Sequence, residues 1–198
     1  MKAEPSTEIR AWKTSAMDAG KCVVVLVDFQ ERLIPAIHEG PRVIEEAIRL
    51  ATASRMLGIR VIGTEQYPNG LGANVAELRK LCDTTVSKNH FDACVEGLLD
   101  VLVPDRTGSR PEIVIAGCEA HVCLMQTALG LLRAEYRVWV VGTACGSRSW
   151  TDHCLAMERL REAGACIVSA EMVLFEWLKS REHVEFRNVL ELVKARLP

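Results

Sequence analysis

The sequence predicts an α/β domain of three layers, in which helices cover both faces of a six-stranded, mainly parallel sheet. Six short apolar segments alternate with longer amphipathic stretches, and these segments are rich in β-branched residues without a polar alternation. Such segments are typical of strands buried on both faces of a parallel sheet. Parallel neighbours need right-handed crossover connections, which place helices on both faces of the sheet.

The six expected strands have similar lengths and lie at 22–27, 60–64, 84–88, 112–117, 137–142 and 166–170. Residues 43–57 repeat apolar side chains at helical spacing, and Gly58 is suited to end that helix. Further helices are expected at 92–102, 121–134 and 151–163, with a surface helix in the tail at 181–198. Residues 68–73 (PNGLGA) indicate a glycine-rich loop after the second strand.

Composition limits the class of protein. The chain has 198 residues, of which 49% are hydrophobic and 25% charged, and its formal net charge is -2. We expect one domain over residues 21–198, preceded by an N-terminal extension over 1–20. The near-neutral charge disfavours a nucleic-acid partner. The longest apolar run, residues 22–27, is far below the ~20 residues that span a membrane, so we expect no membrane partner.

The eight cysteines are expected to be reduced thiols in a cytoplasmic protein. They lie at positions 22, 82, 94, 118, 123, 145, 154 and 166, mostly within apolar segments where a free cysteine packs as a small hydrophobe. Residues 1–21 contain no apolar stretch of the kind a signal peptide needs, and they include three acidic residues. A reducing compartment is therefore expected.

Three chemically active side chains follow predicted strands. Asp28 ends the first strand, Lys88 ends the third, and Cys123 lies in the first turn of the helix after the fourth. Because ligands of open α/β sheets bind at the carboxyl ends of the strands, we expect these groups to meet. The carboxylate can accept the thiol proton, while the lysine and the helix N-terminus favour a thiolate with a lowered pKa. Each residue alone has an ordinary structural interpretation: a cap, a solvated lysine and a buried thiol.

The residues around these positions resemble the isochorismatase-like cysteine hydrolases, which include nicotinamidases and N-carbamoylsarcosine amidohydrolases. The resemblance extends over about residues 23–177. It depends on the segments VVVLVDFQERL (23–33), GTEQYPNGLG (63–72), SKNHF (87–91), IAGCEAHVCLMQTAL (115–129) and GSRSWTDHCLAMERLREAGACIVSAE (146–171). It implies a Rossmann-like isochorismatase fold and a self-associating protein.

The resemblance also implies roles for individual residues. Asp28, Lys88 and Cys123 match the family's catalytic triad, with Cys123 as the nucleophile. A cis peptide bond is implied between Cys118 and Glu119, and the backbone amides of Glu119 and Cys123 would form an oxyanion hole. The substrate pocket would be lined by Gln30, Gln66, Tyr67, Phe91 and Ala120.

The chain departs from nicotinamidases at their Asp-x-His metal motif. Gln66 and Pro68 occupy those positions, and neither side chain supplies the expected ligand, so we expect no metal ion and no cofactor. Cys118, His121 and Cys123 resemble a metal cluster in spacing, but no second ligand pair follows them. Residues 147–149 (SRS) have the side chains to bind an anion, but the resemblance implies subunit contacts for this region.

The expected function is hydrolysis of a small amide, ester or related C–N or C–O bond through a thioester on Cys123. Two alternatives belong to other classes. One is a scaffold or binding protein that retains the triad with little turnover. The other is a nuclease, a name given to some relatives of this family, which the near-neutral charge of -2 disfavours.

Overall fold

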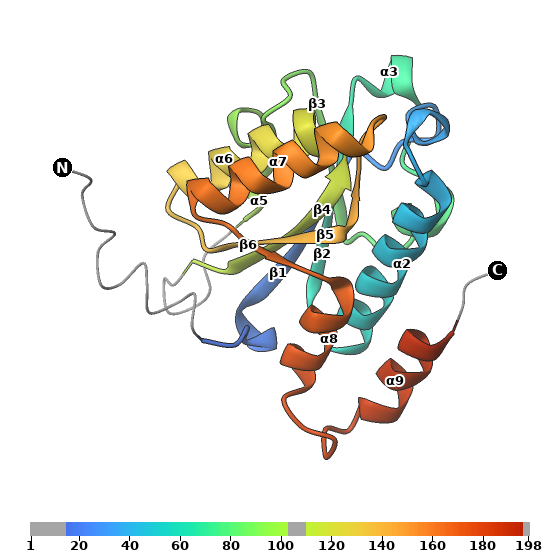
Figure 1. Ribbon diagram of the computed structural model, residues 1–198, viewed down its shortest axis with the longest axis vertical. Helices are drawn as coiled ribbons and strands as arrows, with labels where there is room; N and C mark the ends of the chain where they lie inside the picture. The colour runs from blue at the N-terminus through green and yellow to red at the C-terminus, as the bar shows by residue number, and fades with distance from the viewer. Residues whose placement is uncertain (1–14, 103–109, 196–198) are drawn as a thin grey trace.

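The computed structural model describes residues 15–102 and 110–195, and these form a single six-stranded sheet with helices on both sides (Figure 1). The order of the strands is β3-β2-β1-β4-β5-β6, and every adjacent pair is parallel. The strands are β1 (Cys22–Val27), β2 (Arg60–Gln66), β3 (Thr84–Lys88), β4 (Glu112–Cys118), β5 (Val138–Gly146) and β6 (Cys166–Val168). The predicted three-layer fold is confirmed.

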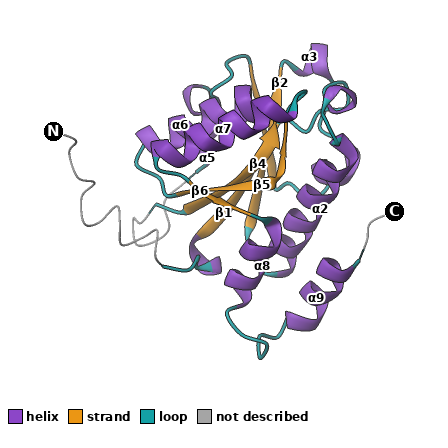
Figure 2. Ribbon diagram, in the orientation of Figure 1, coloured by secondary structure: helices purple, strands orange, loops and turns teal. Residues whose placement is uncertain are grey.

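Each face of the sheet is covered by its own set of helices. Helices α2 (Gly40–Met56), α8 (Ala170–Leu178) and α9 (Phe186–Lys194) cover one face. The short α5 (Leu98–Val101), α6 (Met125–Arg133) and α7 (Trp150–Ala163) cover the other (Figures 1 and 2). Along β1, Val24 and Leu26 pack with the first set, while Val23 and Val25 pack with the second. This two-sided burial explains why the strands show no polar alternation.

Local capping determines where the helices begin and end. Helix α2 has a proline in its first turn and begins three residues before the predicted position. The Ser149 hydroxyl accepts a hydrogen bond from the Asp152 amide at the start of α7, and Gly164 ends that helix. Ser169 caps α8 in the same way, so the predicted strand 166–170 ends at Val168. Helix α8 was not predicted.

The predicted helix at 92–102 is wrong in its middle. Asp92 caps a 3-10 turn over Ala93–Val95, and α5 begins only at Leu98. Between them Gly97 has a φ of 89°, a left-handed conformation that interrupts a right-handed helix. The predicted loop at 68–73 contains one helical turn, α3 (Pro68–Leu71). The remaining short turns are Ala19–Lys21, Ile34–Ala36 and α4 (Ala76–Arg79).

The chain reverses its direction of winding between the central strands β1 and β4. Strands β2 and β3 are added on one side of β1, and β4, β5 and β6 are added on the other. Crevices for ligands form at such a reversal, at the carboxyl ends of the strands. Gly117 lies at this point with a φ of 154°, and a Cβ atom there would lie 2.3 Å from the Val27 carbonyl oxygen. Glycine therefore allows β4 to approach β1 closely.

The described parts of the chain contain no helix that is both long enough and apolar enough to cross a membrane. The predicted N-terminal extension lies mostly outside the described residues. The predicted tail helix at 181–198 is observed as the shorter α9, and residues 196–198 lie outside the described part.

Candidate active site

Asp28 and Lys88 form a buried ion pair at the carboxyl ends of β1 and β3. The Lys88 Nζ donates to Asp28 Oδ2 at 2.7 Å, and both side chains are fully buried. The second carboxylate oxygen, Oδ1, accepts from the Thr64 hydroxyl at 2.6 Å. Asp28 has a φ of 53°, a left-handed value that aspartate tolerates better than most residues. The carboxylate is therefore held at both oxygens, and its charge is matched inside the protein.

Gln66 connects this ion pair to Cys123. The Gln66 Oε1 accepts from Lys88 Nζ at 2.7 Å and from the Cys123 Sγ at 3.9 Å. The Gln66 Nε2 donates to the Asn89 carbonyl at 2.7 Å, which fixes the orientation of the amide. The Gln66 side chain thus contacts two members of the predicted triad, and its expected role in lining the substrate pocket stays a prediction.

Gln30 is part of the framework beneath the site. Its Oε1 accepts from the Gln66 amide at 2.8 Å, and its Nε2 donates to the Gln66 and Gly72 carbonyls at 2.9 and 2.6 Å. The side chain is completely buried, and all of these partners belong to the protein backbone. These contacts hold the end of β2, and the role of Gln30 in lining the pocket stays a prediction.

Cys123 lies in a single π-helical turn, Ala120–Leu124, which runs directly into α6. Its side chain is largely buried, and this burial raises the pKa of the Cys123 thiol to about 12. The negative charge of Asp28 raises the pKa further, and the positive charge of Lys88 opposes both effects. The expected lowered pKa is therefore wrong for the free protein, because burial outweighs the lysine and the helix terminus. The resting group is a protonated thiol.

The turn begins at the Cys118–Glu119 peptide bond, which is cis. The Glu119 carbonyl accepts from the Val122 amide at 3.0 Å and from the Leu124 amide at 3.2 Å. Ala120 is completely buried at the first position of the turn. These contacts close the turn around Glu119, whose own amide follows the cis bond.

The β5–α7 connection touches the same turn, a feature that sequence reasoning missed. The Ser147 hydroxyl lies 2.9 Å from His121 Nδ1, and the Arg148 Nε donates to Glu119 Oε1 at 2.7 Å. Ser147 and Arg148 thus have partners within the protein itself. The sequence gives one signal for this arrangement, the segment 146–171 that begins GSRSW, and it does not indicate that His121 and Glu119 are the contacted residues.

Tyr67 and Phe91 are the most exposed of the expected pocket residues. Their exposed fractions are 55% and 50%, although each closely follows a buried site residue along the chain. The Tyr67 amide donates to the Lys88 carbonyl at 2.8 Å, which places its backbone beside the end of β3. Both aromatic side chains are therefore open to solvent, and their contact with an organic ligand stays a prediction.

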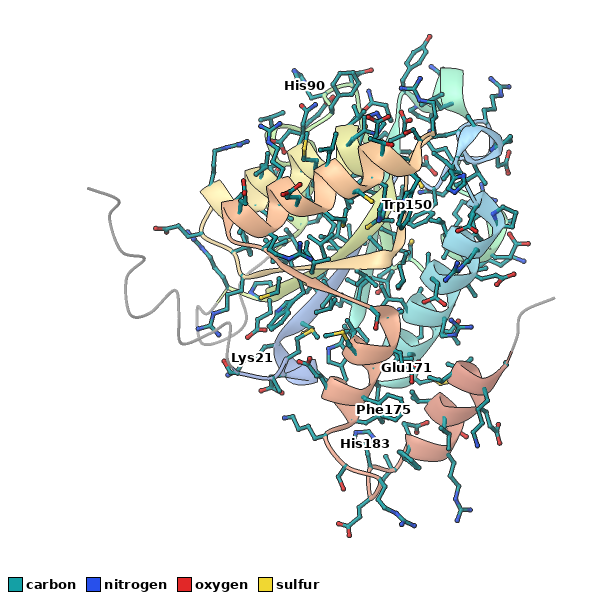
Figure 3. All side chains as sticks on the ribbon, viewed as in Figure 1. Lys21, His90, Trp150, Glu171, Phe175 and His183 are labelled. Carbon is teal, nitrogen blue, oxygen red and sulfur yellow. The ribbon has the colours of Figure 1, made fainter. Side chains whose placement is uncertain are left out.

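A separate cavity of about 500 Å³ lies between the starts of α2 and α7, near Trp150, which Figure 3 labels. None of the predicted triad residues lines it. His153 and Cys154 do line it, but consecutive helical residues do not face each other, so they form no nucleophile–base pair. The side chains that could act as nucleophile and base together therefore lie at the carboxyl ends of β1, β3 and β4.

Comparisons with known proteins identify the family of the chain. The Isochorismatase domain family matches residues 22–172. The chain is 32% identical to isochorismatase domain-containing protein 2A of Mus musculus, covering 89% of this chain and 84% of the relative. It is 36% identical to isochorismatase domain-containing protein 1 of Danio rerio, covering 86% of this chain but only 60% of that longer relative.

Solved structures show the same fold. MAR1 ribonuclease of Caenorhabditis elegans is 31% identical, with a TM-score of 0.84 and coverage of 93% of this chain and 95% of that one. The YcaC gene product of Escherichia coli, described as an octameric hydrolase of unknown specificity, is 20% identical with a TM-score of 0.77, covering 96% and 97% of the two chains. The chain therefore belongs to the isochorismatase family and has its hydrolase fold.

Proposed function

We propose that this protein hydrolyses a small amide, ester or related compound through a covalent intermediate on Cys123. The observation that supports this most strongly is the buried Lys88–Asp28 pair, joined through Gln66 to the Cys123 sulfur. A carboxylate that is desolvated and oriented by two donors can act as a base for a neighbouring thiol. A buried ion pair of this kind contributes little to net stability, which favours a functional reason for it.

In the proposed reaction, Asp28 accepts the proton as the Cys123 sulfur attacks the carbonyl carbon of the substrate. This order follows from the raised pKa of about 12, because the free protein holds almost no thiolate at neutral pH. Lys88 donates a hydrogen bond to the Asp28 carboxylate and orients it before the transfer. A general base of this type contributes about 10²–10⁴ in rate.

The carbonyl oxygen then becomes negatively charged, and the backbone amides of Glu119 and Cys123 would bind it. Each such donor contributes about 10²–10³ in rate. The proton on Asp28 passes to the leaving amine or alcohol as its bond to the carbonyl carbon breaks, which leaves a thioester. Asp28 then removes a proton from a water molecule as its oxygen attacks the thioester carbonyl carbon. The C–S bond breaks, the proton on Asp28 returns to the Cys123 sulfur, and the acid is released.

The same proposal includes the state and location of the protein. An octameric relative supports self-association, which light scattering would measure directly. The cysteines at positions 22, 82, 94, 118, 123, 145 and 154 are thiols outside any disulfide, which supports a reducing, cytoplasmic location.

The test is hydrolysis of a panel of small amides and esters by the wild-type protein and by Cys123→Ala. We expect at least a thousandfold loss of kcat in C123A, roughly the scale seen when a nucleophile is removed from an enzyme of this type. Cys82→Ala is the matched control, because Cys82 is a partly buried thiol with a raised pKa on another part of the molecule. Turnover in C123A within tenfold of wild type would exclude Cys123 as the nucleophile.

The name of the Caenorhabditis elegans relative supports a second candidate, a ribonuclease. Incubation of RNA with wild type and C123A, with and without a chelator, separates the two candidates. Cleavage that needs Cys123 and is unaffected by the chelator would favour the ribonuclease. A wild-type protein that cleaves neither RNA nor any compound of the panel would instead favour the scaffold alternative.

A further inference from the structure

We propose that Ser147 and Arg148, in the connection between β5 and α7, are positioning residues for the oxyanion hole. This inference rests on the proposed function, because it concerns the turn that holds the Glu119 and Cys123 amides. The buried Asp28–Lys88 pair has Thr64, Gln66 and Cys123 among its side-chain partners, whereas Ser147 and Arg148 contact the turn. Their influence on the reaction therefore acts through the backbone of the turn.

Two contacts hold the turn at its start. The Ser147 hydroxyl meets His121 Nδ1 at 2.9 Å, and the Arg148 Nε donates to the Glu119 carboxylate at 2.7 Å. His121 and Glu119 lie on either side of Ala120, so both contacts act within two residues of the proposed oxyanion amide at 119. A donor that is displaced by a fraction of an ångström stabilises a developing charge less well.

The connection is itself fixed, so it can hold the turn in place. The Ser147 carbonyl accepts from the His38 amide at 2.9 Å, immediately before α2. Gly146, the preceding residue, pairs with Cys118 in the β4–β5 register. Ser149, the residue after the arginine, caps α7. Gly146, Ser147 and Ser149 are thus attached to β4, to the residues before α2 and to α7, respectively.

The two contacts differ in strength. Ser147 is 2% exposed and its hydrogen bond to His121 is partly buried, so water competes for it less than for the contact of the exposed arginine. The Arg148 side chain is 63% exposed, and an ion pair at the surface is weak and screened by salt. We therefore expect Ser147 to have the larger effect and Arg148 a smaller one that decreases with ionic strength.

The test compares two reactions of the same sulfur. Acylation by p-nitrophenyl acetate forms the S–C bond and releases nitrophenolate through an oxyanion, whereas alkylation by iodoacetamide displaces iodide without one. In Ser147→Ala we expect acylation to slow by about tenfold or more, a partial loss of one oxyanion donor, while alkylation stays within about twofold. Ser147→Thr, which keeps the hydroxyl, should restore most of the acylation rate.

Two further variants complete the design. Ser169→Ala is the matched control, because Ser169 caps α8 through the Met172 amide at 3.1 Å and does not contact the turn. It should lower stability and leave both reactions of Cys123 unchanged. The double variant His121→Ala/Ser147→Ala should be no slower in acylation than the slower single variant, because the two residues act as a unit.

A failure of the inference differs from a failure of the proposed function. If wild type is alkylated but never acylated, the proposed function fails and the inference falls with it. If wild type is acylated and S147A is acylated at the same rate, or loses both reactions equally, only the inference is overturned. Should S147A not fold, Arg148→Ala decides: about threefold slower acylation at low salt, with the difference disappearing near 1 M salt, supports the inference. No difference at low salt overturns it.

Discussion

Replacing Lys88 with methionine removes a buried charge while keeping the length of the side chain. In the native protein the Lys88 Nζ makes 2.7 Å hydrogen bonds to Asp28 and to Gln66, and both members of the ion pair are fully buried. Removing one partner leaves the other charge uncompensated, which costs about 3–5 kcal/mol. That is a large share of the ~5–15 kcal/mol that stabilises an ordinary domain. We expect Tm to fall by roughly 10 °C or more.

Urea unfolding followed by circular dichroism measures this loss. Lys80→Met is the matched control, because Lys80 is exposed at the end of α4 and its replacement should change stability by no more than about 0.5 kcal/mol. The double variant Asp28→Asn/Lys88→Met should recover at least half of the loss, because no unpaired charge then remains in the core.

The reasoning is refuted by either of two results. A loss below about 1 kcal/mol in K88M would mean that water or a local rearrangement solvates Asp28 in the variant. A double variant no more stable than K88M would mean that the unpaired charge is not the source of the loss.

Three other predictions concern pH and packing. Because the pKa of Cys123 is raised to about 12, its alkylation by iodoacetamide should accelerate about tenfold per pH unit from pH 7 to 10, and a plateau near pH 8 would contradict the burial argument. Burial lowers the pKa of His153, so the neutral imidazole stabilises the folded protein above the unfolded pKa of ~6.5, and this contribution is lost as pH falls. In His153→Gln the free energy of unfolding, measured with urea, should therefore depend less on pH between about pH 7.5 and 5.5. Gly117→Ala would place a Cβ atom 2.3 Å from the Val27 carbonyl and should cost more than about 3 kcal/mol in urea unfolding, whereas Gly20→Ala, with its nearest contact at 3.8 Å, should be tolerated.

The strands could be predicted from the sequence because burial on both faces leaves a simple signal. Helix α8 could not be predicted, because its segment EMVLFEWL has apolar side chains around much of the helix and no amphipathic pattern. Only Ser169 and Ala170 separate this segment from the apolar strand before it. The predicted helix at 92–102 failed because Gly97 ends one turn and begins another, a choice made by backbone conformation. Apolar content alone does not distinguish these cases.

The candidate site was partly predictable for a related reason. The ends of parallel strands meet at one edge of a sheet, so an acid, an amine and a thiol at three such ends must lie near one another. The Gln66 side chain and the Ser147–His121 contact were not predictable, because they join residues 22 to 57 positions apart through particular side-chain conformations. The direction of the Cys123 pKa shift was wrong because local helix geometry says nothing about the depth of burial.

Trapping the thioester tests the central claim most directly. Wild-type protein is mixed briefly with p-nitrophenyl acetate and quenched in acid. Intact-mass spectrometry then counts the acetyl groups, and peptide mapping locates them. We predict one acetyl group, located on Cys123, absent from C123A and strongly reduced in Asp28→Asn. Cys154 is the exposed cysteine, and Cys154→Ala should be acylated like wild type. Ester hydrolysis without an adduct on Cys123, or acetyl groups spread over several cysteines, would contradict the account.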